Sequence, residues 1–281
     1  MKTCYLLGYP VEHSMSAVMH NAAFKQLGLD YRYKLLNVQP SNLEKIVNSF
    51  RDPSFGGANV TIPHKVEVMQ HLDDVDVEAQ RIGAVNTIVL NEDRLVGYNT
   101  DGRGAIKAIT EVYGAVNGAD VVILGAGGAA RAIGYHLSLN AGRIQIFNRT
   151  EKRARELADY LSGLSECNAA VQSQEYTHEK LKTCIGDADI LINATPVGMY
   201  PKIGVSPIDT ELLGSHLLVF DSVYNPLKTR LLKDAENAGA ETLSGLRMLV
   251  HQGVSAFELW TGLNPPGELM YQAARGRLSD E

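Results

Sequence analysis

Short apolar stretches rich in β-branched residues alternate with segments of helical periodicity along the chain. This alternation is typical of an α/β protein whose strands are mostly parallel. Near the start, Met19, Ala23 and Phe24 share one face of a predicted helix. Two further helices are predicted to begin at Pro40 and Pro63, because proline is favoured at the first helical position. The strands predicted in this part cover residues 3–8, 31–36, 57–62, 84–90 and 94–98, the last two flanking a hairpin turn at residues 91–93.

The pattern changes near Asp101, where a helix runs to about residue 113 and a second α/β series begins. We therefore place a domain boundary near Asp101. The second series predicts strands at residues 121–124, 144–147, 190–193 and 217–221. A long helix at residues 246–261 follows, and a turn at residues 265–267 precedes a short terminal helix.

Composition narrows the class of protein. A length of 281 residues suits two domains at roughly 150 residues each. The chain carries 26 Lys and Arg against 32 Asp and Glu, a net charge of −6, with a pI near 5.8. This balance argues against binding to nucleic acid or an anionic membrane through a basic surface. No apolar run approaches the ~20 residues that a membrane-spanning helix needs.

The three cysteines, Cys4, Cys167 and Cys184, are widely spaced and form no C-x-x-C pair. This spacing argues against a disulfide framework and against a cysteine-built zinc site, and it fits a reducing compartment. No spacing of His, Cys, Asp or Glu suggests a metal site. We therefore expect a cytoplasmic protein without a bound metal.

A glycine-rich turn joins the predicted strand at residues 121–124 to the next helix. Its sequence is Gly125-Ala126-Gly127-Gly128-Ala129. Glycines allow a tight turn and a close approach of the backbone to a pyrophosphate, which the helix N-terminus then attracts. Close packing of strand and helix is the alternative explanation. The order of strand, turn and helix favours a dinucleotide site.

The end of the following strand indicates which dinucleotide is bound. An NAD site places Asp or Glu about 20 residues after the glycine turn. This chain has Asn148, Arg149 and Thr150 there, with Arg153 one helical turn later. Cationic and hydroxyl groups suit a 2′-phosphate, which a carboxylate would repel. An exposed cationic helix start is the alternative, and we favour NADP over NAD.

Polar residues also gather at predicted strand ends in the first part of the chain. Ser14 and Ser16 stand at the start of a helix, where they serve either as N-caps or as a carboxylate site. Thr61 and Lys65 lie around the next strand end. In the predicted helix that begins at Pro63, Lys65 would oppose the helix dipole, which favours a functional reason for it.

Two more polar residues lie close to strand ends in this part of the chain. Asn86 stands in an apolar strand, where its amide needs a partner. Asp101 begins a helix and is explained either as a cap or as a functional carboxylate. His13 and His64 are interpreted as solvated or structural. All these positions lie toward the carboxyl ends of strands, where open α/β sheets bind ligands.

Eight short motifs, in order along nearly the whole chain, resemble those of the shikimate dehydrogenase family. They are His13-Ser14-Met15-Ser16, Asn59–Lys65, Gly83–Thr87, Asn99–Gly102, Gly125–Ala129, Asn148–Thr150, Asn193–Met199 and Asp221–Pro226, and Gly245, Met248 and Gln252 complete the series. The resemblance implies NADPH-dependent, reversible reduction of 3-dehydroshikimate to shikimate, a step toward chorismate and the aromatic amino acids.

The resemblance also implies an α/β architecture of two domains. Residues 1–101 and 246–281 would form a substrate-binding domain with a mostly parallel sheet, to which the last helix returns. Residues 102–245 would form a doubly wound Rossmann domain that binds NADP. The resemblance implies a small-molecule substrate as the binding partner, with no binding to nucleic acid or to a membrane. We expect the protein to be a monomer or a homodimer.

Family roles pass to this sequence position by position. Lys65 and Asp101 would be the acid/base pair, since the alkoxide left by hydride transfer needs a proton and nearby positive charge. Substrate contacts are implied for Ser14, Ser16, Thr61, Asn86, Asp101, Tyr224 and Gln252. Besides the glycine turn and the Asn148–Arg153 region, cofactor contacts are implied for Thr195, Ser222, Gly245 and Met248.

One departure and two alternatives accompany the resemblance. Ala17 stands where the family commonly has proline, so we expect a less rigid carboxylate loop with unchanged chemistry. A dehydrogenase acting on quinate as well as shikimate is one alternative function. A non-catalytic NADP-binding regulatory module is the other, and the presence of Lys65 and Asp101 argues against it.

Overall fold

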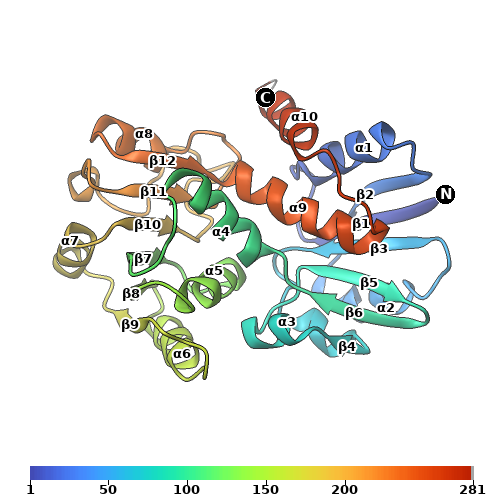
Figure 1. The fold of residues 1–281 in the computed structure, drawn as a ribbon, viewed down its shortest axis with the longest axis horizontal. Helices are drawn as coiled ribbons and strands as arrows, with labels where there is room; N and C mark the ends of the chain where they lie inside the picture. The colour runs from blue at the N-terminus through green and yellow to red at the C-terminus, as the bar shows by residue number, and fades with distance from the viewer. Residues whose placement is uncertain (280–281) are drawn as a thin grey trace. The chain divides into compact units, whose positions relative to one another are not determined.

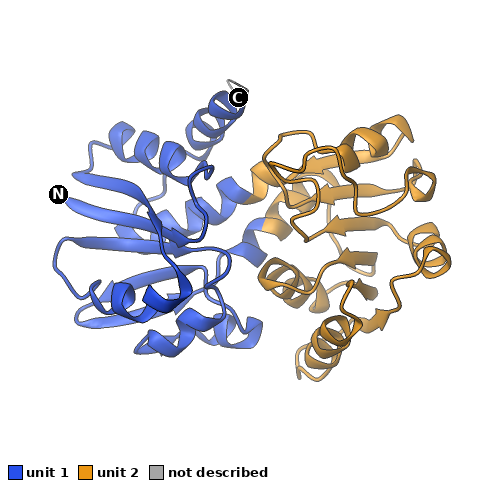
Figure 2. Cartoon of the chain, turned by 180° about the vertical axis from the view of Figure 1, so that it is seen from behind, with its two compact units in different colours: residues 1–104, 249–281 blue, residues 105–248 orange. Residues whose placement is uncertain are grey.

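The computed structural model describes residues 1–279, which divide into two compact units (Figure 2). Unit 1 comprises Met1–Gly104 and the chain from Leu249 onward, and unit 2 comprises Ala105–Met248. The divisions fall within two helices, α4 (Asp101–Val112) and α9 (Gly245–Thr261). These units are defined by compactness alone, so the predicted ranges of a substrate domain and an NADP domain stay predictions.

Unit 1 is built on a six-stranded mixed sheet in the order β2-β1-β3-β5-β6-β4 (Figure 1). Parallel pairs join β1 to β2, β1 to β3 and β4 to β6, and antiparallel pairs join β5 to β3 and to β6. The predicted hairpin is confirmed, with Asn91 opposite Arg94. The strands are β1 (Lys2–Gly8), β2 (Tyr31–Asn37), β3 (Phe55–Val60), β4 (Asp74–Val75), β5 (Thr87–Asn91) and β6 (Arg94–Tyr98).

One predicted helix of unit 1 is absent. No helix begins at Pro63 in the structure; the chain turns through residues 61–66, and the short 3₁₀ helix η2 (Glu67–His71) follows. The carbonyl of Lys65 accepts a hydrogen bond from the backbone N–H of Val85 at 2.7 Å, so it does not close a helical turn. Lys65 is therefore not in a first helical turn, and the argument from an opposed helix dipole was wrong.

The other helices predicted in unit 1 are present, whereas α3 (Val77–Ile82) was not predicted from the sequence. The segment after Pro40 starts as a 3₁₀ turn before it becomes α-helical. The elements are α1 (Ser16–Gln26), η1 (Pro40–Asn42), α2 (Leu43–Asn48), α3 (Val77–Ile82) and α10 (Gly267–Ser279), and the residues of α9 from Leu249 on also belong to this unit.

Residues from both ends of the chain form one aromatic cluster in unit 1. Phe24 of α1 stacks on Phe257 of α9 with ring centroids 4.8 Å apart. The indole of Trp260 donates a hydrogen bond to the carbonyl of Ile88 at 3.1 Å. Gly57 has φ of +139°, and a Cβ at that position would overlap this indole. The C-terminal helices are thus part of the core of unit 1.

His20 lies at the centre of this cluster. Its ring stacks on Tyr33 with centroids 4.6 Å apart, and it is fully buried. Among the residues described, neither ring nitrogen has a hydrogen-bond partner. Burial lowers the pKa of His20 to about 3, because a charged imidazolium would lose its hydration there. His20 is therefore neutral in the folded protein at neutral pH.

Unit 2 contains a six-stranded sheet in which all pairs are parallel (Figure 1). The strands are β7 (Asp120–Leu124), β8 (Arg143–Phe147), β9 (Ala170–Gln174), β10 (Ile190–Asn193), β11 (Leu218–Asp221) and β12 (Glu241–Ser244). Their order, β12-β11-β10-β7-β8-β9, reverses between β7 and β10, which is the switch point of a doubly wound Rossmann sheet. The predicted fold class is confirmed, although β9 and β12 were not predicted from the sequence.

Helices cover both faces of the sheet in unit 2. On one face, Leu181 of α7 (His178–Gly186) and Leu231 of α8 (Arg230–Asn237) share an apolar cluster with Val122 of β7. The neighbouring strand residue, Ile123, points to the opposite face, toward Gly134 of α5 (Gly128–Ser138). The remaining elements are α6 (Glu151–Ser162) and the 3₁₀ turn η3 (Thr210–Leu212). This two-sided cover leaves the carboxyl edge of the sheet for the loops described next.

Candidate active site

Lys65 and Asp101, the predicted acid/base pair, meet in unit 1. The ammonium Nζ of Lys65 lies 2.5 Å from Oδ2 of Asp101. The side chains are 16% and 7% exposed, so the pair is largely shielded from solvent. Lys65 comes from the turn after β3 and Asp101 from the start of α4. A partly buried ammonium held by one carboxylate can deliver or accept a proton at a fixed point.

Asn86 holds this carboxylate from the other side. Its amide nitrogen donates to Oδ1 of Asp101 at 2.8 Å and to the hydroxyl of Thr100 at 3.0 Å. Its amide oxygen accepts from the backbone N–H of Thr100 at 2.8 Å. The predicted need of Asn86 for partners is therefore met, although Asn86 lies just before β5 and not within a strand, as the sequence pattern had predicted. Gln252 joins the same group, with Oε1 3.4 Å from the amide nitrogen of Asn86.

The start of α4 is not capped by Asp101. The backbone N–H of Asp101 donates to the side-chain oxygen of Asn99 at 3.0 Å. Asp101 is itself the first helical residue, and its own carboxylate binds Lys65 and Asn86. The alternative in which Asp101 is only a helix cap was therefore wrong.

Ser14 and Ser16 lie together at the start of α1. Their hydroxyl oxygens are 3.2 Å apart, and Oγ of Ser14 accepts the backbone N–H of Ser16 at 3.2 Å. Met15, at the N-cap position, has a side chain that cannot cap the helix. Thr61 follows β3 and packs against Gly8 at the end of β1. Both interpretations of the serine pair stay open, since one hydroxyl caps locally and the other has donor capacity left.

The glycine turn of unit 2 follows β7, as predicted. Gly125 has φ of +115°, and a Cβ there would lie 2.9 Å from the carbonyl oxygen of Ala194. Gly127 caps α5 without a side chain, and a Cβ at this position would meet nothing within 4 Å. Ala126 and Ala129, on either side of it, are half-buried. The start of α5 is therefore accessible at Gly127, and an accessible helix N-terminus suits a pyrophosphate.

The predicted NADP-selecting residues follow the neighbouring strand, β8. The side chain of Asn148 donates to the carbonyl of Thr150 at 3.0 Å, which shapes the turn into α6. Arg149, Thr150 and Arg153 are exposed. Within the described part of the chain, neither arginine forms an ion pair with a carboxylate. Two unpaired guanidinium groups at this strand end fit a 2′-phosphate.

The remaining predicted cofactor residues lie along the same carboxyl edge. Thr195 follows β10, Ser222 follows β11, and Gly245 follows β12. A Cβ on Gly245 would overlap the carbonyl of Ser222, so the two loops touch. Met248, one turn into α9, is buried. Tyr224, half-buried, also lies in unit 2, and its predicted contact with substrate stays a prediction.

Two polar residues of this edge were given no role by the sequence analysis. Asn193 ends β10 and Asp221 ends β11, and both are fully buried. Burial raises the pKa of Asp221 to about 6, although hydrogen bonds from Thr229, Val223 and Asn193 act in the opposite direction. A polar residue that closes an apolar strand was the available signal for both.

His64, interpreted as structural or solvated, is structural. It is fully buried, and its Nε2 lies 2.7 Å from the carbonyl of Val38. Among the described residues, no group of three His, Cys, Asp or Glu side chains is arranged to hold a metal ion. No helix in the described chain combines the length and apolarity required to cross a membrane.

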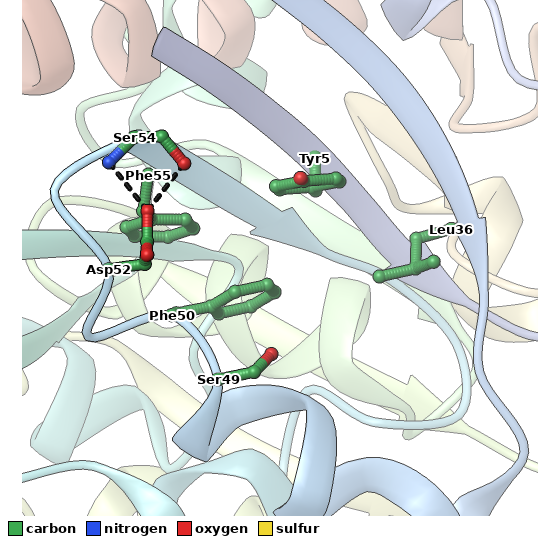
Figure 3. Close-up of a pocket in the computed structure, with 7 residues that line it drawn as sticks. All are labelled: Tyr5, Leu36, Ser49, Phe50, Asp52, Ser54 and Phe55. Carbon is green, nitrogen blue, oxygen red and sulfur yellow. Dashed lines mark hydrogen bonds between the residues drawn. The ribbon is translucent and has the colours of Figure 1, made fainter.

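A small hollow of about 190 Å³ lies elsewhere on unit 1 (Figure 3). Three stacked rings line it. The ring centroids of Phe50 and Phe55 are 4.4 Å apart, and the ring of Tyr5 stacks beside both. Asp52 at its rim is occupied by hydrogen bonds from Ser54. The hollow contains none of the predicted site residues.

The parallel sheet with its glycine turn and the separate lysine–carboxylate pair define a nicotinamide-dependent dehydrogenase of the two-unit α/β class. The shikimate dehydrogenase substrate-binding domain model matches residues 6–88, the shikimate/quinate 5-dehydrogenase model residues 107–200, and the shikimate 5′-dehydrogenase C-terminal domain model residues 245–275. The chain belongs to the shikimate dehydrogenase family.

Individual relatives agree over nearly the full length. The shikimate dehydrogenase (NADP(+)) of Methanocaldococcus jannaschii is 46% identical over 99% of this chain and 98% of its own. A crystal structure of a shikimate dehydrogenase with NADP⁺ superposes with a TM-score of 0.93 at 44% identity, covering 99% of this chain and 96% of that one.

Two further solved structures bear on the choice of substrate. The Thermus thermophilus enzyme in complex with NADP(H) and shikimate gives a TM-score of 0.87 at 37% identity, covering 99% of this chain and 100% of that one. A quinate dehydrogenase from Corynebacterium glutamicum in complex with NAD gives a TM-score of 0.89 at 32% identity, and the match covers 98% of this chain and 99% of that one.

Proposed function

We propose that this chain catalyses the reversible NADP-dependent reduction of 3-dehydroshikimate to shikimate. The observation that carries the proposal is the 2.5 Å contact between Lys65 and Asp101, held by Asn86, in a chain of this family. The family's pathway places the reaction on the route to chorismate and the aromatic amino acids.

Lys65 is the general acid in the direction of reduction and the general base in the direction of oxidation. When NADPH is bound, its nicotinamide supplies a hydride to the ketone carbon. The carbonyl oxygen then gains negative charge, which the ammonium of Lys65 stabilises and neutralises by donating a proton from Nζ. In the direction of oxidation, neutral Lys65 takes the proton of the hydroxyl group. Asp101 orients Lys65, and Asn86 orients Asp101.

The other residues of unit 1 hold the substrate. The hydroxyls of Ser14 and Ser16 bind its carboxylate at the start of α1, where the helix dipole also favours negative charge. Thr61, Asn86, Gln252 and Tyr224 are the residues we propose to contact the carboxylate or the ring hydroxyls. Ala17 makes the serine loop less constrained than proline would, which bears on affinity and not on the chemistry.

The residues of unit 2 hold NADP. The pyrophosphate lies against the glycine turn Gly125–Ala129 and the uncapped start of α5. Arg149 and Arg153, with Asn148 and Thr150, bind the 2′-phosphate that distinguishes NADP from NAD. Thr195, Ser222, Gly245 and Met248 border the nicotinamide half. The proposed NADP domain covers residues 102–245, and residues 1–101 and 246–281 form the substrate domain.

The test is the decay of NADPH absorbance with 3-dehydroshikimate, repeated with NADH. We expect turnover with NADPH and a much lower kcat/KM with NADH. Shikimate and quinate are then compared in the reverse direction, because the quinate dehydrogenase neighbour makes quinate the second candidate substrate. NADP binding without any turnover of these compounds would contradict the proposal and favour a regulatory protein.

We also propose a cytoplasmic location and a monomeric or homodimeric assembly. The three cysteines are unpaired, and Cys4 and Cys184 are buried, which supports a reducing cytoplasm. A monomer or homodimer fits the family, and sedimentation at several protein concentrations measures which of the two occurs.

A further inference from the structure

Asn193 and Asp221 form a buried polar pair across two neighbouring strands. They stand opposite each other at the ends of β10 and β11, and each is 0% exposed. The amide nitrogen of Asn193 donates to Oδ1 of Asp221 at 2.9 Å. Neither residue belongs to the acid/base pair or to the predicted cofactor contacts.

Asn193 fastens the loop that follows its own strand. Its amide oxygen accepts from the hydroxyl of Thr195 at 2.6 Å and from the backbone N–H of Thr195 at 3.1 Å. Its amide nitrogen also donates to the carbonyl of Val197 at 3.2 Å. Both polar atoms of the side chain are therefore committed to holding residues 195–197.

Asp221 fastens the next loop in the same way. Oδ1 accepts from the backbone N–H of Val223 at 3.0 Å, and Oδ2 accepts from the hydroxyl of Thr229 at 2.6 Å. Thr229 in turn accepts from the backbone N–H of Leu232 and caps α8. The carboxylate thus connects the start of the 222–229 loop to the helix at its end.

The two loops are also joined to each other and to the glycine turn. The backbone N–H of Tyr200 donates to the carbonyl of Asn225 at 3.0 Å. The backbone N–H of Ser222 donates to the carbonyl of Asn193 at 2.9 Å. The carbonyl of Ala194 lies where a Cβ of Gly125 would make contact at 2.9 Å. Movement of the loop after β10 would therefore alter the wall of the glycine turn, and the 222–229 loop is hydrogen-bonded to that loop.

The position of these loops indicates which half of a dinucleotide they face. The pyrophosphate site follows β7, at the point where the strand order reverses. The 2′-phosphate residues follow β8 on one side of it. A dinucleotide that lies across the edge with its adenosine half toward β8 must place its nicotinamide half toward β10 and β11.

A carboxylate at position 221 is costly to the fold. Among the described residues, no cationic side chain pairs with Asp221, and burial opposes its charge. An apolar residue of similar volume would fill the position without that cost. Such a residue could not hold Val223, Asn193 and Thr229 together.

We propose that Asn193 and Asp221 are a positioning pair that fixes the two loops against the nicotinamide half of NADP, so that the pair sets cofactor affinity and turnover without touching the substrate. This inference rests on the proposed function, because it assumes that NADP binds at this edge.

The first test compares Asp221→Ala with Asp234→Ala. Asp234 is a matched control: it is buried in α8, it accepts hydrogen bonds from Arg230 and Thr210, and it contacts neither loop. Calorimetric titration gives the Kd for NADPH, and melting gives Tm. We expect Asp221→Ala to weaken NADPH binding and lower kcat by about 10- to 100-fold each, since small misplacement of binding groups has effects of this order. Asp234→Ala should lower Tm while the Kd stays unchanged.

Two conservative variants separate positioning from folding. Asp221→Asn keeps an acceptor toward Val223 and Asn193, and its new amide can donate to Thr229, so it should bind NADPH far more tightly than Asp221→Ala does. Asn193→Asp places two carboxylates across the same contact, and carboxylates this close share one proton. Asp221 is the only titratable hydrogen-bond partner of Asn193 among the residues described, so the affinity of Asn193→Asp for NADPH should recover as the pH falls.

The outcomes separate this inference from the proposed function. If the wild-type protein turns over 3-dehydroshikimate but Asp221→Ala binds NADPH with wild-type affinity and the same kcat, the positioning role is wrong. If Asp221→Ala does not fold, a pH-independent NADPH affinity of Asn193→Asp contradicts the inference in its place. If the wild-type protein lacks turnover altogether, it is the proposed function that fails.

Discussion

Replacing Lys65 by methionine tests the centre of the proposed mechanism. Methionine keeps most of the aliphatic side chain and removes the ammonium that contacts Asp101 at 2.5 Å. The variant loses the proton donor of the reaction while the hydroxyls of Ser14 and Ser16 are untouched. We therefore expect kcat to fall by about 10²- to 10⁴-fold, the usual contribution of general acid–base catalysis, with little change in KM.

The same replacement has a cost in stability that must be separated from the loss of catalysis. It leaves Asp101, which is 7% exposed, with Asn86 as a donor but without a countercharge. Removing one partner of a buried pair destabilises a fold by about 3 kcal/mol, which corresponds to a loss of several degrees in Tm. Adding Asp101→Asn removes the uncompensated charge, so the double variant should regain most of this stability and none of the turnover.

NADPH consumption with saturating 3-dehydroshikimate gives kcat, and melting curves of the same samples give Tm. Arg51→Met is the control, since it removes a 2.6 Å ion pair with Asp73 in the same unit but outside the site. Its kcat should equal that of the wild type. The reasoning is refuted if Lys65→Met keeps kcat within about threefold, a factor far below the acid–base contribution, or if the double variant recovers turnover.

Three further predictions follow from individual groups. Ser14→Ala with Ser16→Ala should raise the KM for the substrate by about 10²- to 10⁴-fold, since each of the two hydrogen bonds to a charged group contributes roughly 1.5–3 kcal/mol; a fall confined to kcat would argue against carboxylate binding. Arg149→Ala with Arg153→Ala should lower kcat/KM for NADPH by a similar factor and leave that for NADH unchanged, so an equal loss for both cofactors would exclude a 2′-phosphate role. The pKa of His20, about 3 when folded, lies below its ordinary value of 6.5, so the unfolded chain binds the proton first as the pH falls. Stability should therefore decrease from about pH 6.5 to pH 3, by on the order of 5 kcal/mol in all. His20→Phe should remove that slope from urea unfolding measured across this range, whereas an unchanged slope would assign it to other groups.

In unit 2, the sequence predicted the strands whose residues are buried on both faces. The run Val121–Leu124 is continuous and apolar because it lies at the centre of a covered parallel sheet. The strands β9 and β12 were not predicted, and they are the two edge strands of that sheet. Their mixed sequences, such as Ala170–Gln174, reflect partial exposure, which local patterns do not distinguish from loops.

The wrong helix at Pro63 has a different cause. A proline at that position is compatible with a helix start, but the backbone of Lys65 is bound by Val85, which is twenty residues away in sequence. A non-local hydrogen bond of this kind leaves no mark in the local pattern.

Some residues of the candidate site could be assigned from the sequence and others could not. Family resemblance, and not periodicity, assigned Lys65 and Asp101 to one pair, and the structure brings them together. The need of Asn86 for partners was predicted because an amide in an apolar strand must be satisfied. Asn193 and Asp221 were passed over, because the sequence does not tell whether a polar residue at a strand end turns inward or toward solvent.

The composition of unit 1 from both ends of the chain has a consequence for biosynthesis. Residues 105–248 are synthesised as one continuous stretch. The complete sequence of unit 2 therefore exists before α10 has been translated. The first hundred residues, in contrast, lack Phe257 and Trp260 until translation is nearly over. Phe24 and the other aromatic residues of this segment lack these partners during that interval, which leaves the segment open to aggregation until the C-terminal helices are made.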